Sequence, residues 1–159
     1  MKQLKTILHG CASARSLFFA TIAVLALPNI ALCFTERMSL MADITNVVLP
    51  TAAVWLLMTL NRCPGKMVWW LFILVFFAAF QLVLLYLFGH SIIAVDMFLN
   101  VVTTNPGEAF ELLDNLIPAV FGVVIVYVPL LIMAVVSIRR RQWLEHGFLL
   151  KQRRYAAIT

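Results

Sequence analysis

Charged residues are scarce in this sequence of 159 residues. Charged residues make up 12% of it and hydrophobic residues 64%, whereas soluble globular domains have about 25% and roughly 45–50%. A domain that folds in water keeps charge on its surface, and this chain has too little to cover its apolar excess. The composition therefore excludes an ordinary soluble domain and predicts a protein whose solvent is lipid.

The side chains that usually perform catalysis or cross-link small secreted domains are also sparse. The three cysteines form no C-x-x-C pair, which argues against a disulfide framework or a membrane thiol oxidase. The three histidines are scattered, and no Asp/His cluster has the spacing of a zinc site. No G-x-S-x-G, Walker or Ser/His/Asp arrangement occurs. The sequence therefore predicts no catalytic residue, no metal ligand and no cofactor in this chain.

Long apolar runs are what the sequence has in abundance. A helix needs about 20 apolar residues to cross the hydrocarbon core, and four runs come close to that length: about 17–34, 42–60, 67–88 and 116–138. No A-x-A-like cleavage site follows the first run, so we expect it to remain as a helix. These runs predict an all-α fold, a polytopic helical membrane bundle with four transmembrane helices in a single domain, 1–159.

The basic residues indicate the orientation of the bundle. Eleven of the twelve fall on one side of the four runs, and only Arg37 falls on the other. Cytoplasmic loops carry an excess of Lys and Arg, so both termini and the tail 139–159 are predicted in the cytoplasm and the loop 89–115 in the periplasm of a bacterial inner membrane. The basic residues adjoin helix ends, and we therefore expect no nucleic-acid partner. The eleven are Lys2, Lys5, Arg15, Arg62, Lys66, Arg139, Arg140, Arg141, Lys151, Arg153 and Arg154.

The connection 89–115 is unusually long, at 27 residues. Loops of that length in a compact unit are usually functional. Its first half is apolar, which predicts a helix lying in the membrane interface. Its second half begins with Asn105, Pro106 and Glu108 at the N-cap, N1 and N3 positions of a helix. The loop is therefore expected to form two short periplasmic interfacial helices, with a break at residues 103–105.

Three polar residues of this loop recur at intervals of four: Asn100, Thr104 and Glu108. This spacing aligns them on one face of a continuous helix, whereas across a break they would converge from two helix ends. An amide, a hydroxyl and a carboxylate can together bind a phosphate or glycerol oxygen and face an ammonium group. The trio is a candidate substrate-binding site for a zwitterionic lipid head group. The alternative is that Glu108 only completes the helix cap.

Residues 98–113 resemble the periplasmic loop of bacterial phosphoethanolamine transferases, enzymes that decorate lipid A and related glycans. That family shows an N-x-x-x-T-x-x-x-E-A pattern after its third transmembrane helix. Four residues here match the pattern: Asn100, Thr104, Glu108 and Ala109. The helix order, the cytoplasmic N-terminus and the basic run after the fourth helix are also similar to that family.

The resemblance implies a membrane domain of an enzyme that moves phosphoethanolamine from phosphatidylethanolamine to lipid A or a related glycan. The implied partners are the phosphatidylethanolamine head group and lipid A. In that family a fifth transmembrane helix leads to a periplasmic domain with zinc and a threonine nucleophile. Nothing in these 159 residues matches that domain, so we expect no transfer activity from them alone. The end of the chain, from Arg153 on, is either the start of such a fifth helix or a plain cytoplasmic tail.

A second interpretation belongs to another class of protein, a small four-helix transporter or assembly factor without catalysis. The transporter form is weakened because no charged residue lies well inside any of the four runs, and ion-coupled carriers need one. The exchange of Glu108 for Gln separates the two interpretations, because only the first predicts weaker binding of a lipid head group.

Overall fold

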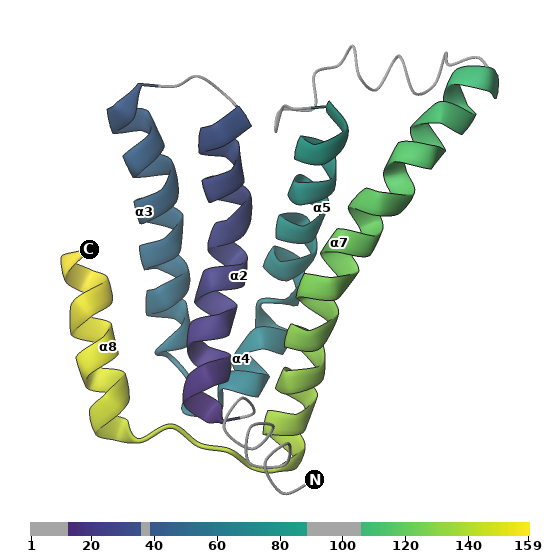
Figure 1. The fold of residues 1–159 in the computed structure, drawn as a ribbon. Helices are drawn as coiled ribbons and strands as arrows, with labels where there is room; N and C mark the ends of the chain where they lie inside the picture. Colours follow the sequence, from purple (N-terminus) through teal and green to yellow (C-terminus); the bar gives the residue numbers. More distant parts are fainter. Residues whose placement is uncertain (1–12, 36–38, 89–105) are drawn as a thin grey trace, which may run out of the picture.

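The computed structural model describes residues 13–35, 39–88 and 106–159 (Figure 1). Within these ranges the chain forms six helices and no strand. The all-α helical bundle predicted from the sequence is confirmed. The helices are α2 (Ala14–Thr35), α3 (Leu40–Met58), α4 (Pro64–Trp70), α5 (Phe72–Phe88), α7 (Pro106–Arg139) and α8 (His146–Ile158).

Helix α2 lies at the centre of the bundle and contacts α3, α4, α5 and α7. In Figure 1, α3 and α5 stand on either side of α2, α8 lies beyond α3, and α7 lies beyond α5 and leans away from the other helices at its start. The contacts agree with this order, since α8 packs on α3 while α4 and α5 pack on α7. Helices distant in the sequence, α2 and α7, are thus neighbours in the bundle.

Several helices have the length and apolarity to cross a membrane. Three qualify singly in the part of the chain described: α2, α3 and the stretch Leu116–Arg139 of α7. The pair α4 and α5 is a fourth if it counts as one broken span. Large apolar side chains cover the outside of these helices, for example Phe77 at 59% and Phe121 at 65% exposure. Because water would not tolerate such a surface, the chain is a membrane protein.

The third apolar run differs from its prediction as a single helix over about 67–88. The structure divides it into α4 and α5, which are bent by 66° around Leu71. Neither proline nor glycine lies at the bend, so the usual local causes of a kink are absent. The cause is tertiary, because α4 turns to pack on α7 and buries Met67, Val68 and Leu71 in the core.

The fourth run also extends further than predicted. Instead of a separate short helix followed by a helix over about 116–138, α7 is one helix of 34 residues. Between Glu108 and Ile117 the sequence holds neither proline nor glycine, and Pro118 removes one helical hydrogen bond without ending the helix. The described part of the helix begins at Pro106, the residue predicted at the first helical position. The predicted cap Asn105 and the first interfacial helix of the loop lie outside the described residues.

The buried core gathers at one end of the bundle. Its larger cluster joins the start of α2, the end of α3, α4 and the end of α7, with Phe18, Met58 and Val68 completely buried. A smaller cluster of Leu25, Val75 and Tyr127 lies further along the bundle. Helix α3 buries only its last residue, Met58. The helices therefore hold together mainly at this end, which is also where Arg62 and Arg139 lie.

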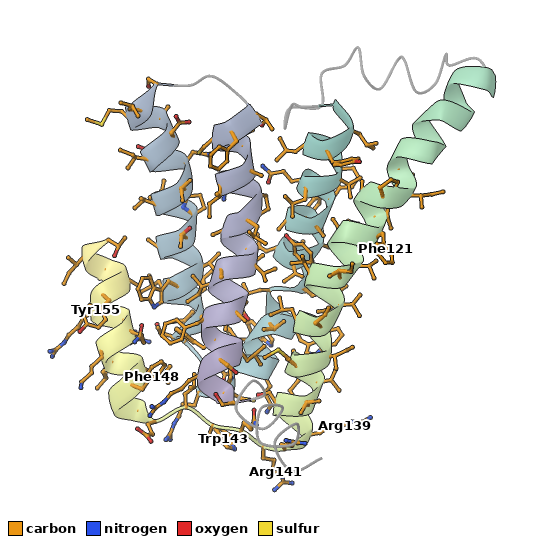
Figure 2. The ribbon with its side chains drawn as sticks, viewed as in Figure 1. Phe121, Arg139, Arg141, Trp143, Phe148 and Tyr155 are labelled. Carbon is orange, nitrogen blue, oxygen red and sulfur yellow. The ribbon has the colours of Figure 1, made fainter. Side chains whose placement is uncertain are left out.

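The predicted cytoplasmic tail 139–159 contains a helix that packs on the bundle. Helix α7 ends at Arg139 and is followed by Arg141 at φ 49°, and the N–H groups of Arg141 and Gln142 donate to the carbonyls of Ile138 and Ser137. This is the hydrogen-bond pattern of a Schellman cap, in which the left-handed residue turns the chain sharply. A short connection then crosses the end of the bundle, where Figure 2 shows Arg139, Arg141 and Trp143, and leads into α8.

Candidate functional site

The three residues predicted to bind a head group are only partly within the described structure. Asn100 and Thr104 lie outside the described residues, while Glu108 belongs to the first turn of α7. The structure therefore does not test whether the amide, the hydroxyl and the carboxylate come together. Of the pattern, only Glu108 and Ala109 lie in the described structure, in the first turns of α7.

This end of α7 extends well beyond the apolar stretch of the helix. The apolar run in the sequence begins at about Leu116, after the acidic residues Glu111 and Asp114, and the described part of α7 begins at Pro106. At 1.5 Å per residue, about 15 Å of helix precede Leu116, and Glu108 lies about 12 Å along the axis from it. Figure 1 shows that this extension leans away from α5 and the rest of the bundle. The start of α7 can therefore present polar groups outside the hydrocarbon layer.

Below this extension, α7 exposes an apolar surface to the surroundings. A shallow groove of about 330 Å³ runs along its first membrane turns, and it is almost entirely apolar. Phe121 points away from the bundle at this level (Figure 2). Such a surface can accept an acyl chain, but it contains no group that could recognise a head group. The lining residues are Leu116, Ile117, Val120, Phe121 and Val124.

Polar side chains also meet where the end of α2 faces the start of α3. The thiol of Cys33 donates to the carbonyls of Asn29 at 3.2 Å and of Asp43 at 3.8 Å. Ser39 is the N-cap of α3, with its hydroxyl accepting from the N–H of Ala42. Asp43 lies in the first turn, where its charge stabilises the helix dipole. These contacts cap α3 and join it to the end of α2, and they do not form a site.

At the opposite end of the bundle, charged and aromatic side chains attach α8 to α2. Arg15 pairs with Glu145 at 3.2 Å, and its guanidinium lies 5.3 Å from the centre of the Phe148 ring. Phe148 also packs edge-on against Phe18 and Phe19, with ring centres 5.6 and 6.0 Å away. Figure 2 shows Phe148 on the side of α8 that faces the bundle, whereas Tyr155 points outward. Helix α8 is thus fixed to the protein along one side.

A second set of contacts fixes α8 to the end of α3. The indole N–H of Trp55 donates to the amide oxygen of Gln152 at 3.1 Å. The guanidinium of Arg153 lies 3.5 Å from both the hydroxyl and the carbonyl oxygen of Thr59. With α8 in this position, Arg153 and Arg62 line the same pocket, although in the sequence they indicate only the orientation of the bundle. Their meeting depends on how α8 docks, and no local spacing in the sequence indicates it.

The described residues offer no place for a metal ion, since no group of three or more His, Cys, Asp or Glu side chains among them could hold one. These residues therefore do not fit the zinc site of the transferase family, and no step of a reaction through zinc can be assigned to them. No protein-family model matches the chain, and no curated protein or solved structure matches it either.

Proposed function

We propose that the chain is the membrane domain of a bacterial phosphoethanolamine transferase and that Asn100, Thr104 and Glu108 bind the head group of phosphatidylethanolamine. The observation that carries the proposal is the N-x-x-x-T-x-x-x-E-A pattern, whose last two residues fall in the first turns of α7. In this proposal the amide and hydroxyl bind phosphate or glycerol oxygens. The carboxylate of Glu108 faces the ammonium group.

The position of Glu108 in α7 supports a role at the lipid head groups. The head-group layer is roughly 5–8 Å thick on each side of the hydrocarbon core. Glu108 lies about 12 Å along the axis from the apolar stretch, and the lean of α7 in Figure 1 lowers this height. The carboxylate would then lie at the edge of the head-group layer that faces water, where it could contact an ammonium group. Catalysis, with zinc, would belong to a separate periplasmic domain.

The distribution of basic residues supports the orientation of the domain. Arg62 lies just after α3 and Arg139 ends α7, at the end of the bundle where α2 begins. By the positive-inside rule this end faces the cytoplasm, so the chain would sit in the bacterial inner membrane with its N-terminus inside and the loop 89–115 in the periplasm. Lipid A, the acceptor in the family it resembles, would be reached from the periplasmic side.

Head-group binding tests the proposal directly. The purified chain in detergent would be titrated with short-chain phosphatidylethanolamine and short-chain phosphatidylglycerol, with binding followed by intrinsic fluorescence. We expect tighter binding of the ethanolamine lipid and a loss of about five- to ten-fold for Glu108→Gln, the range for one partly hydrated charged contact. Glu111→Gln, one turn further along α7, is the matched control. Equal affinities of Glu108→Gln and Glu111→Gln for the ethanolamine lipid would overturn the proposal. That result is expected if the chain is a transporter or an assembly factor.

A further inference from the structure

A pocket of about 240 Å³ lies between the end of α3 and α8, at the basic end of the bundle. Pockets that enclose a drug-sized ligand usually measure about 300–1,000 Å³. This one suits a single phosphate group better than a sugar or a nucleotide. Its wall has both polar and apolar parts, formed by Thr59, Leu60, Arg62, His146, Leu149, Leu150 and Arg153.

The polar part of the wall is cationic and has spare hydrogen-bond donors. Arg153 touches Thr59 only at the 3.5 Å limit of hydrogen bonding, so most of its five N–H groups remain available. Among the described residues, the side chain of Arg62 forms no ion pair and no hydrogen bond. His146 adds an imidazole donor at the start of α8, where the helix dipole also favours an anion.

No carboxylate among the described residues neutralises this pocket. The acidic residue nearest in the sequence is Glu145, and it is held in the ion pair with Arg15 on the α2 side of α8. Between residues 115 and 159 the sequence holds no other Asp or Glu. Arg62 and Arg153 therefore face an anion from outside the chain with their charges intact.

The apolar part of the wall indicates the kind of anion. Leu60, at 62% exposure, and Leu150, at 46%, line the pocket together with the buried Leu149. Leu60 comes two residues after the membrane-suited helix α3, so the pocket lies where the apolar surface of the bundle meets its basic end. An amphiphile satisfies both parts, with its phosphate on the arginines and its acyl chain along the leucines.

We propose that this pocket binds the phosphate of an anionic phospholipid from the leaflet at the basic end of the bundle. Arg62 and Arg153 hold the phosphate, His146 donates to it, and Leu60 and Leu150 contact the acyl chains. The lipid then joins α8 to the end of α3, two elements that otherwise meet through few polar contacts. This site is separate from the head-group site proposed at the start of α7, and either can fail without the other.

The test uses the full chain in detergent and four probes: short-chain phosphatidylglycerol, short-chain phosphatidylcholine, glycerol phosphate and inorganic phosphate. We expect phosphatidylglycerol to bind most tightly. Arg62→Gln should weaken it about five-fold, the equivalent of about 1 kcal/mol per basic residue at an anionic membrane surface. Arg62→Gln with Arg153→Gln should weaken it by about 25-fold. The matched control is Lys66→Gln with Arg154→Gln, two exposed basic residues outside the pocket.

Each outcome supports or overturns the site. The Arg62 side chain has no partner among the described residues, so we expect Arg62→Gln to keep the fold. A loss of phosphatidylglycerol binding with an unchanged circular dichroism spectrum supports the site. An equal loss in the control pair would show general surface attraction and overturn it, as would full affinity in Arg62→Gln. Binding of inorganic phosphate or glycerol phosphate as tight as that of phosphatidylglycerol would overturn the assignment to a lipid.

Discussion

Gly65 provides the sharpest test of how the bundle is packed. It lies in the first turn of α4 and packs directly against the backbone of α7. A Cβ atom added there would overlap the carbonyl oxygen of Ala134 and would stand 3.0 Å from side-chain atoms of Ser137 and Ile138. Small residues on both sides allow the two backbones to approach, a common device between membrane helices. Because the first obstacle is backbone, no side-chain rotation can relieve the overlap.

We therefore expect Gly65→Ala to destabilise the protein. Overpacking a filled interface costs about 1–3 kcal/mol. The better helix propensity of alanine returns about 1 kcal/mol at most, and less in a first turn. The net loss should be about 1–2 kcal/mol. It should appear as a shift of the unfolding midpoint when the purified protein in mixed micelles is titrated with a denaturing detergent and followed by tryptophan fluorescence.

Gly122→Ala is the matched control, because it makes the same chemical change within helix α7 at a position where an added Cβ meets nothing within 4 Å. It should leave the free energy of unfolding unchanged or raise it by up to about 1 kcal/mol. Equal stabilities of Gly65→Ala and Gly122→Ala would refute the close approach of α4 and α7. That result would also remove the explanation given for the bend between α4 and α5.

Three further substitutions test the basic end of the bundle by the same unfolding assay or by limited proteolysis. Leu144→Ala should cost about 2–5 kcal/mol because this connecting residue is buried at 2% exposure, and a smaller loss would mean that the connection is loosely packed. Gln152→Leu removes the acceptor of the Trp55 indole and should lower the free energy of unfolding by about 1 kcal/mol. The protease should then cut the connection before α8 faster, and an unchanged rate of cleavage would contradict the docking of α8 on α3. Arg141→Gly should stabilise the left-handed cap by up to about 1 kcal/mol, whereas Arg140→Gly should not.

The helices themselves were readable from the sequence because length and apolarity decide them. The runs predicted over about 17–34 and 42–60 appear as α2 and α3, each shifted by two or three residues at its start. Pro106, predicted at the first position of a helix, is the first described residue of α7. These features are local, so one stretch of sequence contains the whole signal.

The bend between α4 and α5 was not readable, because it comes from packing between distant segments. The residues around Leu71 are bulky and apolar, as in an unbroken membrane helix. The approach of Gly65 to Ala134 joins positions far apart in the chain. A lone glycine after a proline, as in Pro64 and Gly65, indicates a turn and says nothing about which helix it will meet.

Of the two candidate sites, one depends on a local pattern in the sequence and the other on packing between distant segments. The head-group pattern of Asn100, Thr104 and Glu108 is a local spacing and was found in the sequence, and it stays a prediction. The pocket between Arg62 and Arg153 needed the docking of α8 on α3 to become visible. In the sequence, the order of charges places both arginines at the basic end of the bundle and gives no sign that they share a pocket.

The most direct measurement of the central proposal is photolabelling with phosphatidylethanolamine that carries a diazirine near the top of one acyl chain. Membranes containing the full chain are irradiated, and the labelled peptides are mapped by mass spectrometry. The proposal predicts label concentrated between residues 98 and 121, displaced by unlabelled phosphatidylethanolamine but not by phosphatidylglycerol, and reduced by Glu108→Gln. Label spread evenly over the lipid-facing surfaces of α5 and α7, with no head-group preference, would contradict it.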